Sequence, residues 1–98
     1  MNIQAMMKQA QAMQKDMLKI KSEVDNTEFV GESSLVKVTV KGTKEVVKVE
    51  IDSTNDLESD DIEMLQDMIM IAINEANKKV DAEMEKKMGK FGNIPGLF

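Results

Sequence analysis

The first two dozen residues carry apolar side chains at alternating spacings of three and four residues. The positions are Ile3, Met6, Ala10, Met13, Met17, Ile20 and Val24. This unbroken heptad pattern predicts a helix over residues 2–25 with a narrow apolar seam, which is typical of helices that pack against another helix. Lys8, Lys15 and Lys19 fall on the side opposite the seam. One face of the predicted helix therefore packs, and the other is cationic.

Residues 26–52 change to the alternating pattern of β-strands. A short first strand ends before residues 31–34, which we expect to form a turn, and Gly42 begins the second turn. The apolar positions Val36, Val38 and Val40 share one face, and Val47, Val49 and Ile51 form the inner face of the next strand. The pattern predicts a three-stranded antiparallel meander.

A second helix is expected over residues 60–88, and its first half is apolar around much of its circumference. Residues 89–98 contain three glycines and one proline, which favour a flexible tail. The predicted fold class is α+β, with residues 1–98 forming one domain. A domain of this size cannot bury both apolar helix faces alone, so we expect a homodimer. The predicted interface residues are Met6, Met13, Met17, Ile20, Leu65, Met68, Ile69 and Ala72.

The composition removes most catalytic chemistry. The chain has no histidine and no cysteine, so the commonest general base, metal ligand and thiolate nucleophile are missing. The acidic stretch that begins at Asp52 does not fit a calcium loop, because Leu57 stands where a glycine is required. We therefore expect no enzyme activity, cofactor, metal or small-molecule substrate. No segment has the length and apolarity of a membrane span, which indicates a cytoplasmic protein without a membrane partner.

Charge is unevenly distributed along the chain, although the formal net charge is −5. Residues 52–67 hold seven acids and no lysine, whereas residues 1–24 hold four lysines and two acids. All 13 basic residues are lysine, so any anion is met by point charges rather than by bidentate guanidinium groups. The candidate DNA-binding residues are Lys8, Lys15, Lys19, Lys21, Lys78, Lys79, Lys86 and Lys87. The last four also complement the dipole of the second helix, as they would in any protein.

Five segments in order resemble the YbaB/EbfC family. They are residues 6–14 (MMKQAQAMQ), 35–40 (LVKVTV), 45–52 (EVVKVEID), 74–79 (NEANKK), and the ending formed by residues 88–90 and 95–98. The sequence departs from the family at residues 32–34 (ESS), where a glycine-rich turn is common. The resemblance implies a nucleoid-associated, DNA-binding homodimer shaped like tweezers, whose charged helices contact duplex DNA. Without arginine, phosphate contacts should dominate and sequence selectivity should be weak.

Two other functions are compatible with the residues. An adaptor protein would use the methionine-rich helices or the Leu97-Phe98 end to bind another protein. A carboxylate-based hydrolase ranks last, because no acid pair stands out from the acidic run. Gel shifts at low salt would separate the adaptor from a DNA-binding protein.

Overall fold

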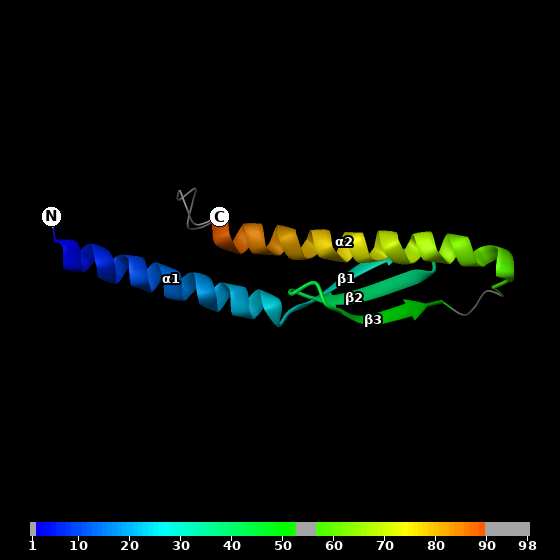
Figure 1. Ribbon diagram of the computed structural model, residues 1–98, viewed down its shortest axis with the longest axis horizontal. Coiled ribbons are helices and arrows are strands. Elements are labelled where there is room, and N and C mark those ends of the chain that lie inside the picture. Colours follow the sequence, from blue (N-terminus) through cyan, green and yellow to red (C-terminus); the bar gives the residue numbers. More distant parts are fainter. Residues whose placement is uncertain (1, 53–56, 90–98) are drawn as a thin grey trace.

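The computed structural model describes residues 2–52 and 57–89, and it confirms the predicted α+β fold (Figure 1). The elements are α1 (Ile3–Asp25), β1 (Glu28–Ser33), β2 (Val36–Lys41), β3 (Val46–Ile51), the short 3₁₀ helix η1 (Ser59–Asp61) and α2 (Ile62–Met88). The bounds of the two long helices lie within two residues of the predicted ones, whereas β1 extends three residues beyond the predicted end of the first strand. The predicted flexible tail lies outside the described residues apart from Gly89.

The three strands form one antiparallel sheet in the order β1-β2-β3. The predicted first turn was wrong, because Gly31 lies within β1, opposite Val38 of β2. The reason is tertiary: a Cβ atom at Gly31 would overlap the backbone carbonyl oxygen of Ala72. This glycine therefore serves close helix–sheet packing rather than chain reversal.

The core lies between α2 and the inner face of β1 and β2. Val36, Val38 and Val40 are buried there, as predicted. The prediction that β3 has a buried inner face is confirmed only in part. Val49 and Ile51 do share the face of Val38 and Val36, but they are 44% and 41% exposed. The helix crosses β1 and β2 and leaves β3 largely outside its footprint.

The molecule is elongated, with extents of 71 × 21 × 15 Å and a radius of gyration of 19.5 Å. A compact chain of this length would have a radius of gyration of about 13 Å. The difference arises because α1 runs beyond the end of α2 (Figure 1). Residues 3–19 of α1, here called the arm, are exposed except for the half-buried Met13 and Met17, whereas Ile20 and Val24 join the core. Among the described residues, neither helix is apolar enough to cross a membrane.

Candidate nucleic-acid interface

Three lysines form a stripe along α1. Lys8, Lys15 and Lys19 are all exposed, and their spacings of seven and four residues place them on one side of the helix. The stripe extends about 16 Å along the helix axis at 1.5 Å per residue. None of the three has a hydrogen bond or ion pair within the described part of the chain. Their ammonium groups are therefore available to an external anion.

The sequence of the arm explains why it is helical at this position. The Asn2 side-chain oxygen Oδ1 accepts hydrogen bonds from the backbone N–H groups of Gln4 and Ala5, at 3.1 and 3.4 Å. This N-cap satisfies donors that the first turn would otherwise leave unpaired. Alanine, glutamine, methionine and lysine, which fill most of the arm, all have high helix propensity. The helix holds the lysines on one face and directs the apolar seam the opposite way.

Of the other predicted DNA-binding lysines, two are engaged within the protein. Lys21 pairs with Asp25 at 2.9 Å, although its side chain remains exposed. The Lys79 ammonium group donates a hydrogen bond to the Val30 carbonyl oxygen at 2.6 Å. Lys79 therefore links α2 to β1 through a hydrogen bond between residues 49 positions apart in the sequence. No local sequence pattern indicates such a contact.

The remaining predicted lysines lie on the second half of α2. Lys78 and Lys86 are exposed, and Lys87 is half-buried in the last turn of the helix. Within the described residues none of them forms an ion pair. Sequence reasoning did not find the ion pair between Lys44 and Asp81, which joins the β2–β3 turn to α2 at 2.9 Å. Lys44 is thus already neutralised by a partner.

The predicted dimer residues occupy different environments. Met6 is exposed on the arm, whereas Ile20 and Ala72 are buried inside the protomer. The other five are half-buried. Met13 lies on the arm, and the remaining four pack against the protomer's own core: Met17, Leu65, Met68 and Ile69. Most of these side chains therefore already have partners within one chain. Their role between subunits stays a prediction.

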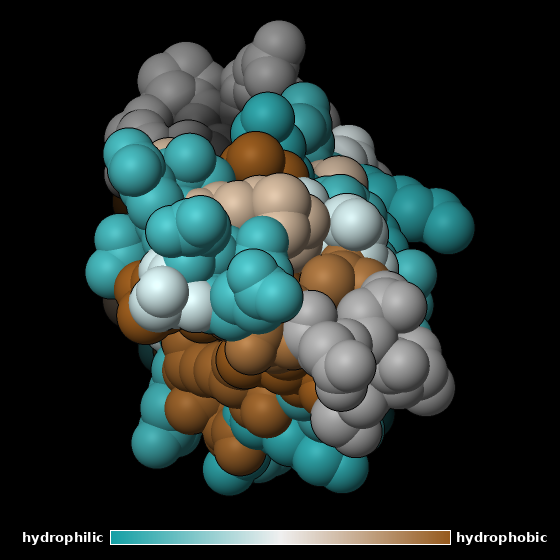
Figure 2. Space-filling model, turned by 90° about the vertical axis from the view of Figure 1, so that its right-hand side faces the viewer, coloured by the Kyte–Doolittle hydropathy of each residue, from teal (hydrophilic) through white to brown (hydrophobic). Residues whose placement is uncertain are grey.

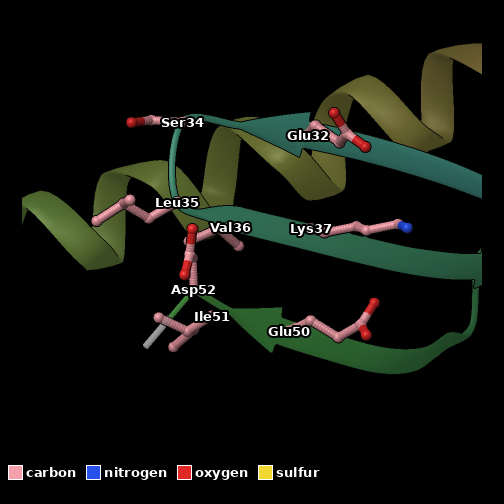
Figure 3. Close-up of a pocket in the computed structure, with 8 residues that line it drawn as sticks. All are labelled: Glu32, Ser34, Leu35, Val36, Lys37, Glu50, Ile51 and Asp52. Atoms are coloured by element: carbon pink, nitrogen blue, oxygen red, sulfur yellow. The ribbon is translucent and has the colours of Figure 1, made fainter. Parts of the chain in front are cut away.

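The outer face of the sheet is net acidic around Lys37. Lys37 of β2 lies between Glu32 of β1 and Glu50 of β3, in register across the three strands (Figure 3). These residues border a shallow depression of about 450 Å³ whose rim also carries Asp52. Three carboxylates against one ammonium group would repel a phosphate. The described residues contain no cluster of acids arranged to hold a metal ion.

Acidic side chains gather where α2 begins, at the end of the molecule opposite the arm (Figure 1). This acidic end comprises Glu58, Asp60, Asp61, Glu63 and Asp67. Glu58 and Asp61 cap η1 reciprocally, and the Glu58 backbone N–H donates to Asp61 Oδ2 at 2.9 Å. No lysine lies in residues 57–67 to offset these carboxylates. The fold thus places the cationic stripe and the acidic end at opposite extremes of its longest axis.

Comparison with known proteins identifies the family of this chain. The model of the YbaB/EbfC DNA-binding family matches residues 1–94. The chain belongs to the YbaB/EbfC DNA-binding family. It is 45% identical over 99% of its length to a nucleoid-associated protein of Pelotomaculum thermopropionicum, covering 96% of that protein. A nucleoid-associated protein of Ligilactobacillus salivarius is 40% identical over 99% of the chain and 95% of its own length.

Among solved structures, an uncharacterised protein of Helicobacter pylori shares the fold. Its TM-score is 0.75 at 22% sequence identity, and the match covers 93% of this chain and 97% of that one. At this identity the likeness establishes the arrangement of helices and strands alone. The family assignment rests on the family model and on the nucleoid-associated relatives.

Proposed function

We propose that this member of the YbaB/EbfC family binds duplex DNA as a homodimer, through phosphate contacts made by the arm. The observation that carries the proposal is the stripe of Lys8, Lys15 and Lys19, which are exposed and unpaired within the described residues. Lysines of the sheet lie among carboxylates, and Lys79 is used within the fold. The other lysines of α2, although they form no ion pair within the described residues, share residues 75–88 with four acids. The arm is therefore the part of the described surface best suited to a polyanion.

The composition of the interface determines how DNA would be read. A lysine ammonium group contacts phosphates as a point charge, and the chain has no arginine to grip a guanine edge bidentately. Phosphate contacts position a protein on the duplex without carrying sequence information. The protein would accordingly bind unrelated sequences with similar affinity. Such binding suits a protein that resides in the nucleoid and helps to organise it.

The second half of the proposal is the homodimer. The apolar seam of the arm continues from the buried Ile20 and Val24 through Met6 to Ile3, which is 71% exposed. An isolated helix of residues 3–16 would be marginal in water, because nucleation is costly and packing supplies most helix stability. A second protomer covering the seam would stabilise the arm and leave the lysines, on the opposite side, free for DNA.

The salt dependence of binding tests this proposal. A dimer that uses Lys8, Lys15 and Lys19 of both chains makes four to six phosphate contacts, so affinity should fall by roughly two to three decades between 50 and 200 mM salt. Fluorescence anisotropy on three duplexes of unrelated sequence should give the same slope and similar dissociation constants. If no duplex were bound at 50 mM salt, the DNA-binding proposal would be overturned.

A further inference from the structure

The contact between α1 and the rest of the protein is small. Only Ile20 and Val24 of this helix are buried in the core, and Met17 packs against them. Figure 2 shows apolar side chains gathered on the sheet side at the end of the molecule where α2 begins. The helix α1 lies toward the other end and gains no packing from them (Figure 1). The direction in which the arm projects therefore depends on a few contacts near the last turn of α1.

Gly42, the first residue of the β2–β3 turn, touches the last turn of α1 directly. It is buried, and a Cβ atom on it would lie 1.8 Å from the Val24 carbonyl oxygen and 2.9 Å from the Asp25 backbone nitrogen. Both neighbours are backbone atoms, which cannot rotate away as a side chain can. The φ angle of Gly42 lies outside the left-handed region. The glycine is therefore required by the close approach of the two backbones, and not by its own conformation.

Hydrogen bonds complete the contact between this turn and the helix end. The Gly42 N–H donates to the Thr27 carbonyl oxygen at 3.0 Å. The side chains of Asn26 and Thr27 donate to carbonyl oxygens of the last turn of α1, at 2.8 and 2.7 Å. These bonds satisfy acceptors that the end of a helix leaves without a partner. Residues 22–27 and Gly42 are here called the junction.

The β2–β3 turn is also attached to α2. Two residues beyond Gly42, the ammonium group of Lys44 pairs with Asp81 of α2 at 2.9 Å. The turn therefore contacts the end of α1 and the second half of α2, and it links the direction of the arm to the body of the protein. An exposed ion pair contributes little to stability. The close backbone packing at Gly42 is accordingly the stronger of the two restraints.

A small change at the junction is magnified along the arm. A Cβ atom at Gly42 would have to retreat by about 1.2 Å from the Val24 carbonyl oxygen to reach 3.0 Å, the shortest separation that such contacts show. If α1 pivots at Ile20, about 6 Å from Val24 along the helix axis, this shift tilts the helix by about 11°. Lys8 lies about 18 Å beyond the pivot, so its backbone would move by about 4 Å. That displacement exceeds the length of a contact between an ammonium group and a phosphate oxygen.

We propose that Gly42 is a positioning residue for DNA binding, because its contact with the end of α1 fixes the direction in which the arm presents its lysines. The inference rests on the proposed function of the arm. Phosphates of a duplex occupy fixed relative positions, and phosphate contacts set how a protein lies on the duplex. An arm that is held in one direction makes several of these contacts without the entropy cost of ordering it on binding.

Two single variants of the full chain test the contact. G42A adds one methyl group at the junction. T43S removes one methyl group from the next residue, whose side chain is exposed, and keeps the hydroxyl oxygen that accepts from the Glu45 N–H. Both variants preserve the net charge, so a difference between them reports on the contact of Gly42 with α1.

The direction of the arm can be measured without DNA. The chain has no native cysteine, so A5C on the arm and A82C on α2, both exposed, can carry a pair of spin labels. Dilution of the labelled chain into an excess of unlabelled chain isolates the distance within one chain. By electron–electron resonance we expect G42A to shift or broaden this distance by at least about 3 Å, and T43S to keep it within about 1 Å of wild type. A purely structural role of Gly42 would lower the melting temperature without moving the arm of the folded protein.

DNA binding by the unlabelled variants gives the second measurement. We expect G42A to bind a duplex about tenfold more weakly than wild type at 50 mM salt, with a shallower salt slope, because fewer phosphates are contacted at once. T43S should stay within about twofold of wild type. Circular dichroism at the temperature of the titration shows whether each variant is folded.

A further variant covers the case in which G42A does not fold. N26A/T27V removes the two side-chain hydrogen bonds that hold the end of α1, at exposed positions where a loss of folding is not expected. With the same pair of spin labels we expect a broader distance distribution than in wild type. A distribution as narrow as that of wild type would overturn the role of the junction.

The outcomes distinguish this inference from the proposed function. A folded G42A chain with the wild-type distance, or one whose arm moves while its affinity for the duplex stays within twofold of wild type, would overturn the positioning role of Gly42 and leave DNA binding by the arm standing. A wild-type chain that binds no duplex at 50 mM salt would instead overturn the proposed function, and the role of Gly42 in DNA binding with it.

Discussion

The two ends of this molecule carry opposite charge and have opposite structural roles. The arm holds Lys8, Lys15 and Lys19 on a helix that projects away from the core. At the other end, five carboxylates surround the start of α2, where acids complement the helix dipole and cap η1. The carboxylates have a structural explanation within the chain, whereas the arm lysines have none.

The separation explains how a chain with a net charge of −5 can belong to a DNA-binding family. The longest extent of the molecule is 71 Å, whereas the Debye length at physiological salt is about 8 Å. The acidic end therefore contributes little to the potential at the arm. Under the proposed function, local charge rather than total charge would determine where a duplex is attracted.

The largest effect is expected from removing the arm lysines. The triple variant K8Q/K15Q/K19Q eliminates up to six phosphate contacts in a dimer, and we expect it to weaken DNA binding at 50 mM salt by at least about 100-fold. The slope of log affinity against log salt should also become shallower, because fewer phosphate contacts release fewer counterions. Anisotropy titrations with the duplexes used for wild type would measure both quantities. Glutamine preserves helix propensity, so circular dichroism should be unchanged.

A matched control moves the same charge change to the sheet. The variant K37Q/K41Q/K48Q also removes three positive charges, but from a face where glutamates lie opposite the lysines. We expect less than about a fivefold loss of affinity, arising from the more negative overall field. Equal losses in the two triple variants would mean that total charge governs binding, and the distinction between the arm and the rest of the surface would fail.

The smallest effect is expected at the acidic end. The variant D60N/E63Q/D67N removes three carboxylates and spares Asp61, which accepts the capping hydrogen bond from Glu58. Because of screening over the length of the molecule, duplex affinity should rise by less than about threefold at 150 mM salt. An increase of tenfold or more would show that the acidic end reaches the bound DNA.

Periodicity was enough to predict the elements of the fold. The heptad spacing from Ile3 to Val24 and the alternation of Val36, Val38 and Val40 each report which side of an element meets apolar surroundings, and the structure confirms the helix and the strand. The lysine stripe follows from the same argument, because positions on the face opposite a seam must be exposed. The local sequence pattern is enough to predict a feature that depends on a single helix or strand.

Contacts between distant elements could not be read from local pattern. Glycine is common in turns, so the sequence suggests a turn at Gly31. Only the close approach of the Ala72 backbone explains why this glycine lies within β1. Val49 alternates as an inner-face residue should, but its exposure depends on where α2 crosses the sheet. Lys79 is one of two adjacent lysines in the sequence, and only the structure distinguishes it by its hydrogen bond to Val30.

The central claim, that the duplex lies along the arm, is tested most directly by cleavage from a tethered probe. Ala12 lies within the lysine stripe and Gln66 lies at the acidic end, and both are exposed. Because the chain has no native cysteine, A12C and Q66C can each carry a single iron chelate that cleaves nearby DNA through hydroxyl radicals. We predict strong duplex cleavage from position 12 and background cleavage from position 66. Cleavage from position 66 with none from position 12, at matched occupancy of the duplex, would contradict the account.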